Sequence, residues 1–193
     1  MSYSDSIDAI VLKHRDLLDL LLNDKMLRQK IDESISVIIQ ALEQGNQILF
    51  CGNGGSAADA QHLAAEFVSQ FYLKRKALNA EALTVNTSSL TAISNDSDYQ
   101  KVFSRQVEAK GKSGDVLVGI TTSGGSQNVL NAFDAAKNIG MTNIAFVGAD
   151  TDKVKDKANI IISVPSDDTP RIQEMHIMIG HIICECVEKG VEF

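Results

Sequence analysis

The chain has 193 residues, of which 44% are hydrophobic and 22% are charged, and its formal net charge is −7 at neutral pH. This is the composition of an ordinary globular protein, so we expect it to fold. The negative charge, and the absence of a basic run longer than residues 74–76, argue against a protein that neutralises nucleic-acid phosphates. We therefore expect no nucleic-acid partner.

The cysteines and the N-terminus bear on location. The three cysteines form no C-x-x-C pair and their number is odd, which fits a reducing compartment. The first residues lack a basic segment followed by an apolar one, and no apolar stretch reaches the length of a membrane span. We expect a cytoplasmic protein without a membrane partner.

Two amphipathic helices are predicted first, because apolar residues recur every three to four positions over residues 5–23 and 26–42. From residue 47 onward, short apolar runs alternate with helical patterns. We predict strands at 47–51, 81–85, 116–121, 143–147 and 160–164, and helices at 56–70, 88–94, 99–110, 126–139 and 151–157. This alternation predicts an α/β fold with a parallel sheet covered on both faces.

A final helix is predicted from near Pro170 to about Lys189, since proline is favoured at the first helical position. Residues 175–187 are apolar almost all round, so we expect this stretch to be deeply buried, within the domain or between subunits. Repeats, low-complexity segments and linkers are absent from the sequence. We expect a single domain over residues 1–193, with a helical pair at 1–45 and an α/β core at 46–193.

The glycine-rich stretch CGNGGSA, at residues 51–57, follows the first predicted strand. Gly52, Gly54 and Ala57 satisfy the letters G-x-G-x-x-G/A of a dinucleotide-binding loop. Such a site also needs an acidic residue at the end of the second strand, where this chain has Asn86 and Thr87. The sequence therefore disfavours a dinucleotide.

A second glycine loop, ITTSGGSQN at residues 120–128, follows the third predicted strand. Hydroxyl side chains surround its two glycines, and the next helix would offer unpaired N–H groups and a positive dipole end. This is the pattern of a phosphate cradle without a lysine. Serine and glycine can also merely cap a helix and turn the chain. Two such loops at one sheet edge, with Ser56 in the first, favour a phosphorylated small molecule.

The helix after the first loop carries His62 and Glu66, which lie on one face because they are four residues apart. Alone, they are typical of a surface ion pair or a core histidine. The final helix carries Gln173 and His181 in an otherwise apolar stretch, where unpartnered polar groups are costly. The four side chains could form a metal site suited to Zn²⁺ or an acid/base pair, and spacing alone leaves both open.

The chain resembles the sugar isomerase (SIS) domains, and among them the phosphoheptose isomerases. The resemblance covers nearly the full chain and is carried by CGNGGSAADAQHLAAE at 51–66, SLTAISND at 89–96, FSRQVEA at 103–109, GDVLVGITTSGGS at 114–126 and VPSDDTPRIQEMHIMIGH at 164–181. It implies a three-layer α-β-α sandwich with a five-stranded parallel sheet and two N-terminal helices. It also implies a homotetramer that the N-terminal helices help to assemble.

The implied reaction is the aldose–ketose isomerisation of sedoheptulose 7-phosphate to glycero-manno-heptose 7-phosphate through an enediol, for heptose biosynthesis (lipopolysaccharide core or capsule). The resemblance implies substrate binding by Asn53, Gly54, Gly55, Ser56, Glu66, Asn95, Asp96, Thr121, Thr122, Ser123, Ser126 and Gln173. It implies one Zn²⁺ ion per subunit, held by His62, Glu66, Gln173 and His181, and proton transfer by Glu66 and His181. His14 and His176 are interpreted as structural.

Two positions depart from the family pattern. Gln70 stands where many of these enzymes carry arginine, and Pro170 stands where some carry an acidic residue. An isomerase for another phosphosugar is therefore one alternative. Another alternative is a non-catalytic sugar-phosphate-binding module, like the related proteins that bind the replication initiator DnaA. Those proteins lack the complete set of the glutamate and the second histidine, whereas this chain has both, Glu66 and His181.

Overall fold

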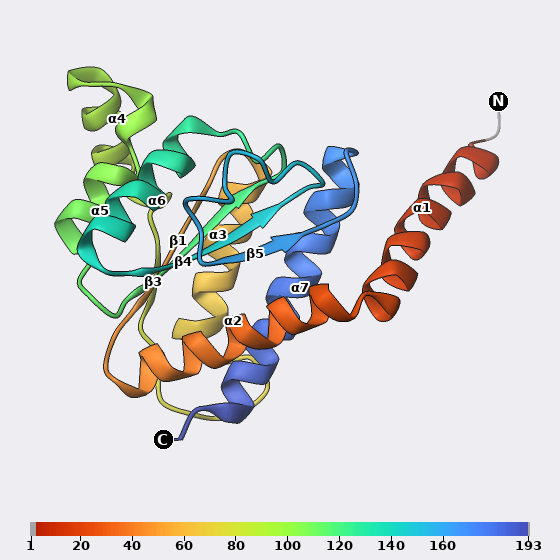
Figure 1. Cartoon of the computed structure of the whole chain (residues 1–193), viewed down its shortest axis with the longest axis horizontal. Helices are drawn as coiled ribbons and strands as arrows, with labels where there is room; N and C mark the ends of the chain where they lie inside the picture. Colours follow the sequence, from red (N-terminus) through yellow and green to blue (C-terminus); the bar gives the residue numbers. More distant parts are fainter. Residues whose placement is uncertain (1–2, 193) are drawn as a thin grey trace.

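A computed structural model describes residues 3–192 and shows a sheet with helices on both faces (Figure 1). The five strands are all parallel and follow the order β2-β1-β3-β4-β5. They are β1 (Ile48–Gly52), β2 (Ala80–Ala82), β3 (Val116–Thr121), β4 (Thr142–Val147) and β5 (Ile160–Ser163). The five-stranded parallel sheet predicted from the sequence is confirmed.

The described chain also contains seven α-helices and one short 3-10 helix. They are α1 (Ser4–Asn23), α2 (Lys25–Glu43), α3 (Gly55–Val68), α4 (Thr87–Asp96), η1 (Tyr99–Lys101), α5 (Ser104–Lys110), α6 (Gln127–Ile139) and α7 (Thr169–Gly190). Alternate strand residues face opposite sides. Phe50 and Val118 pack with α2, α3 and α7, whereas Leu49 and Leu117 pack with α5 and α6. The central strands are therefore apolar along their whole length.

The strand order places β1 beside β3. From β1 the chain moves to one side to form β2, and it then crosses to the other side for β3, β4 and β5. The crevice between β1 and β3 is therefore the point where the winding direction reverses, and ligands of open α/β sheets bind outside the carboxyl ends of the strands at such a point. Both glycine-rich loops follow these two strands.

Two predicted helices are corrected by the structure. Residues 151–157 form a series of turns, because a segment this short with Val154 as its only buried apolar residue cannot offset the cost of helix nucleation. The predicted helix at 99–110 is divided into η1 and α5. The Asp98 carboxylate accepts a hydrogen bond from the Gln100 N–H at 2.7 Å, which starts the separate 3-10 turn.

The first helix extends away from the body of the molecule, with the N-terminus at its far end (Figure 1). Only Leu17 and Leu21 of α1 are buried. On the rest of its apolar face, Ile7 is 57% exposed and Val11 is 60% exposed. The amphipathic pattern of α1 was correctly predicted, but most of its apolar face has no covering within one chain.

The final helix is buried on one side only. Met175 and Ile179 lie in the core, whereas Ile182 and Cys186 are exposed in the single chain. Residues 175–187 are apolar almost all round, so one subunit leaves part of their apolar surface uncovered.

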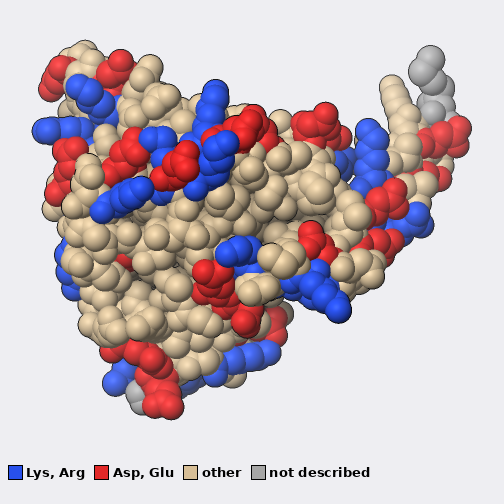
Figure 2. Space-filling model, in the orientation of Figure 1, with Lys and Arg blue, Asp and Glu red and all other residues tan. Residues whose placement is uncertain are grey.

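None of the helices in the described range is both long and apolar enough to cross a membrane. On the face shown in Figure 2, basic and acidic side chains are interspersed and a broad uncharged band crosses the middle.

Candidate functional site

The two glycine loops lie next to each other at the carboxyl edge of the sheet. Gly52, at the end of β1, is paired with Ile120 in β3. Asn53 in the first loop and Asn128 in α6 exchange two hydrogen bonds between their side-chain amides, of 2.9 and 2.8 Å. The Tyr99 hydroxyl donates a third hydrogen bond to the Asn53 side-chain oxygen at 3.1 Å. Asn53 thus joins the two loops into one surface.

The second loop gathers its hydroxyl groups at the start of α6. The Thr121 hydroxyl donates to the Ser126 hydroxyl at 3.0 Å. Gly124 has a φ of +65°, and a Cβ at this position would collide with the carbonyl oxygen of Asp150. Only glycine therefore fits this turn. The arrangement leaves small polar groups and helix-terminal N–H groups together, as a phosphate requires.

The first loop leads into α3, and its glycines bring α7 close. Gly54 precedes the helix with a φ of +56°, and Ser56 is buried in its first turn. A Cβ on Gly55 would overlap the side-chain amide of Gln173. Glycine at this position therefore lets α7 place a polar amide against the beginning of α3.

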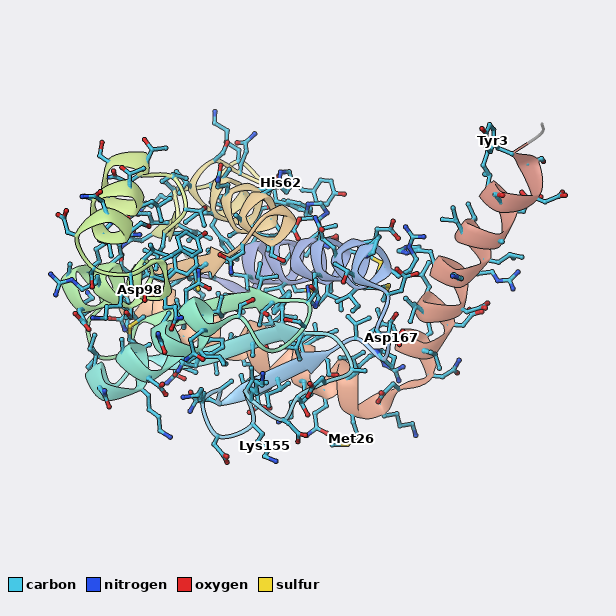
Figure 3. The ribbon with its side chains drawn as sticks, turned by 90° about the horizontal axis from the view of Figure 1, so that it is seen from above. Tyr3, Met26, His62, Asp98, Lys155 and Asp167 are labelled. Atoms are coloured by element: carbon cyan, nitrogen blue, oxygen red, sulfur yellow. The ribbon has the colours of Figure 1, made fainter. Side chains whose placement is uncertain are left out.

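Further along the same two helices, three side chains converge. The Nε2 atoms of His62 and His181 lie 2.9 Å apart, and His62 Nε2 lies 3.2 Å from Glu66 Oε1. One ligand atom from each of the three lies within 4.8 Å of the others. His62 and Glu66 share a face of α3, and α7 brings His181 alongside; Figure 3 shows His62 on α3 next to α7.

The chemistry of this cluster fits a divalent metal ion. Two imidazole nitrogens facing each other cannot both present lone pairs without a proton or a cation between them, and a carboxylate stands beside them. Nitrogen and oxygen donors of this kind suit Zn²⁺, and three protein ligands would leave a position open. The His62 side chain is 50% exposed, so the position is accessible from solvent. The group is therefore a possible metal site.

Gln173, the fourth predicted ligand, lies on α7 together with His181. It lies two turns before His181, and its amide is hydrogen-bonded to Asp59. Asp59 is only 7% exposed. Burial raises the pKa of Asp59 to about 6, although the hydrogen bond from Gln173 and the charge of His62 oppose this shift. Sequence reasoning missed Asp59, although its position three residues before His62 on the same helix face was a usable signal.

A buried ion pair supports the far end of the cluster and was also missed. Glu188 accepts hydrogen bonds from the backbone N–H groups of residues 71–73, at 2.6 to 2.8 Å, and from Arg75 Nε at 2.8 Å. Arg75 in turn donates to the backbone carbonyls of Glu66 and Phe67, both at 2.9 Å. The pair therefore connects the end of α3, the following loop and α7.

The remaining predicted residues lie apart from the cluster. Asn95 and Asp96 are exposed at the end of α4, and the Asn95 amide donates to the Asp96 carboxylate at 2.8 Å. His14 Nδ1 lies 3.0 Å from Glu174 Oε2. His176 is fully buried with Nε2 3.1 Å from the Val147 carbonyl oxygen, and burial lowers its pKa to about 4 despite this hydrogen bond. The contacts of both histidines agree with structural roles.

Comparison with known proteins extends these observations. A family model described as the SIS domain matches residues 15–148. A phosphoheptose isomerase of Clostridium acetobutylicum is 54% identical over 183 residues, which is 95% of this chain and 93% of its relative. A phosphoheptose isomerase of Helicobacter pylori is 49% identical and covers 96% of this chain and 95% of its own length.

Solved structures agree with this assignment. The phosphoheptose isomerase of Neisseria gonorrhoeae superposes with a TM-score of 0.90 at 40% identity, over 97% of this chain and all of that one. The Francisella tularensis enzyme gives a TM-score of 0.93 at 32% identity, over 98% of this chain and all of that one. The fold, the paired glycine loops and the near-complete coverage lead to one conclusion. The chain belongs to the SIS domain family and, within it, to the phosphoheptose isomerases.

Proposed function

We infer that this protein is an aldose–ketose isomerase that converts sedoheptulose 7-phosphate to D-glycero-D-manno-heptose 7-phosphate. Relatives about 50% identical over nearly the whole chain carry the name phosphoheptose isomerase. The observation that carries the inference from the structure is that one helix, α3, begins at a glycine-rich loop and places Glu66 beside His181 further along. His62 lies about 10 Å along the helix axis from Gly55. A substrate with a phosphate at one end and the reacting carbons at the other fits this layout.

The phosphate end is proposed to bind at the paired loops. The hydroxyls of Ser56, Thr121, Ser123 and Ser126 would donate to its oxygens, with the N–H groups at the start of α3 and α6. Asn53 lies between the loops and Asp96 lies at the end of α4, and both are proposed to contact the sugar. The remaining members of the proposed binding set are Gly54, Gly55, Asn95, Thr122 and Gln173.

The reacting end is proposed to lie at the cluster of His62, Glu66 and His181. Isomerisation moves one proton between C1 and C2 and another between the two attached oxygens. Glu66 and His181 are proposed to carry out these transfers, since a carboxylate and an imidazole can each accept and return a proton. A Zn²⁺ ion, one per subunit, would be held by His62, Glu66, Gln173 and His181 and would polarise the substrate oxygens.

The test of this function is turnover by the purified, zinc-loaded protein. Incubation with sedoheptulose 7-phosphate should produce the aldose, and NMR would measure its formation. A strong chelator should abolish this activity. Zinc added back should restore it, because the cluster supplies nitrogen and oxygen donors suited to this ion. Binding of the sugar phosphate without turnover, in the zinc-loaded protein, would contradict the inference and favour a non-catalytic module of the DnaA-binding type.

The whole chain is proposed to form a single SIS domain over residues 1–193 that assembles as a homotetramer in the cytoplasm, with residues 1–45 contributing to the assembly. The support is the exposed apolar face of α1, which one chain does not cover. A large exposed apolar surface commonly marks a protein interface.

The double substitution Ile7→Glu/Val11→Glu should therefore reduce the oligomer to smaller species. Two charges would enter the apolar face of α1, where both side chains are more than half exposed in the single chain. Light scattering coupled to size exclusion measures the mass. Ala9→Glu adds a charge on the opposite side of α1 and serves as the control. A mass equal to the unsubstituted protein in the double variant would contradict an assembly role for α1.

A further inference from the structure

A lysine stands beside the second glycine loop, although the loop itself contains none. It is Lys153, from the series of turns after β4. Its ammonium nitrogen lies 3.4 Å from the position that a Cβ on Gly125 would occupy, and the Ser123 hydroxyl lies 3.7 Å from the same point. The Ser123 hydroxyl also accepts a hydrogen bond from the Gly125 N–H at 3.2 Å. The Lys153 ammonium group therefore lies close to the Ser123 hydroxyl, which is proposed to bind phosphate.

The backbone that carries Lys153 is fixed to this loop. The Gly148 N–H donates to the Thr122 carbonyl at 3.1 Å, and the Asp150 carbonyl packs closely on Gly124. Val154, the next residue after Lys153, is fully buried. The long side chain of Lys153 therefore starts from an anchored position and reaches the loop without a movement of the main chain.

The charge of Lys153 is not compensated by this chain. Among the residues that the structure describes, no carboxylate lies within ion-pair distance of its ammonium group. The other two lysines of the same turns are paired: Lys155 with Asp152 at 3.2 Å, and Lys157 with Asp134 at 2.6 Å. An unpaired ammonium over glycines and hydroxyls is an arrangement that favours an anion.

We propose that Lys153 is a substrate-binding residue that supplies the positive charge of the phosphate subsite. This proposal rests on the function inferred above. A sugar phosphate is mostly a dianion at neutral pH, whereas hydroxyls and N–H groups provide only partial charges. A point charge from lysine would favour the phosphorylated sugar over its neutral counterpart without taking part in proton transfer at the other end of the substrate.

Lys153→Met should raise KM for sedoheptulose 7-phosphate about tenfold and leave kcat within about twofold, since only remote binding is lost. Inorganic phosphate, used as a competitive inhibitor, should lose affinity by a similar factor. Lys153→Arg should retain most of the affinity for the substrate and most of the affinity for inorganic phosphate. The matched control is Lys155→Met, which removes a paired lysine two residues away and should change neither value. Raising the salt concentration should narrow the difference between Lys153→Met and the unsubstituted protein.

Two outcomes separate this proposal from the proposed function. Equal KM and phosphate inhibition in Lys153→Met and Lys155→Met, in an active protein, would overturn the role of Lys153 and leave the isomerase standing. An unsubstituted protein without turnover would overturn the isomerase. In that case calorimetric titration with inorganic phosphate still decides the role of Lys153, because a tenfold weaker binding confined to Lys153→Met would support it and equal binding would overturn it. Circular dichroism would verify that all variants are folded.

Discussion

Glu66→Gln should lower kcat for the isomerisation by about 100- to 10,000-fold, the usual contribution of a positioned general acid or base. The glutamine keeps the size of the side chain but cannot accept a proton from carbon. Glu66 lies 3.2 Å from His62 and within the same cluster as His181, so its carboxylate stands at the proposed reacting end. NMR of the sugar phosphate measures turnover, and a fluorescence or calorimetric titration measures binding, which should be largely retained.

The zinc content of the variant must be measured alongside its activity, because Glu66 is also a proposed metal ligand. Lost turnover with retained zinc would assign the loss to proton transfer, whereas lost zinc would assign it to the metal site. Glu185→Gln is the control, since Glu185 is a partly exposed carboxylate of α7 that pairs with Lys189 at the surface. Full activity in Glu66→Gln would refute the assignment of the base.

Glu188→Gln should destabilise the folded protein by about 3–5 kcal/mol, the range for breaking a buried ion pair. The side chains of Glu188 and Arg75 are 1% and 2% exposed, and the charge of Arg75 would remain buried without its partner. For a chain of this length the melting temperature should fall by roughly 10 °C. Differential scanning calorimetry would test this, with Glu185→Gln as the matched exposed variant. An equal melting temperature in the two variants would contradict a stabilising role for the pair.

The contribution of Glu188 to the free energy of unfolding should also depend on pH. Burial alone would raise its pKa, but hydrogen bonds from Phe71, Tyr72, Leu73 and Arg75 outweigh burial and lower the pKa from 4.5 to about 2. A group whose pKa is lowered in the folded state stabilises the fold when the pH is above the ordinary pKa of that group. For Glu188 this contribution is lost as the pH falls from about 4.5 toward 2. The difference in urea-unfolding free energy between the unsubstituted protein and Glu188→Gln should shrink from pH 6 to pH 3. A constant difference would contradict the proposed linkage.

The fold was largely predictable because its elements carry strong local patterns. The run at 116–121 is buried along its whole length, and β3 has the bounds predicted for it. Proline at the start of α7 marked that helix correctly. The prediction was wrong at 151–157, where the helix-forming residues have too few core contacts, and the strand near 81–85 is shorter because it lies at the sheet edge. Tertiary packing decides such segments.

The site was predictable only in part. The spacing of His62 and Glu66 places them together on any helix, but their meeting with His181 depends on how α3 and α7 pack, which no local pattern encodes. The same holds for Glu188, whose partners lie more than a hundred residues earlier. Lys153 was invisible for another reason, since the sequence places it outside the glycine loop and only the strand order returns its turn to that loop.

The position of α7 has a consequence for the making of the protein. This helix follows all five strands in the chain, yet it covers the core face of α2 and α3 through Ile172, Met175, Ile179 and Ile183. A nascent chain that has emerged from the ribosome only as far as residue 168 would contain all five strands, but one apolar face of the core would be uncovered. Interrupted translation products should therefore be recognised by chaperones and degraded rather than accumulate. The cluster of His62, Glu66 and His181 can form only after synthesis has passed His181.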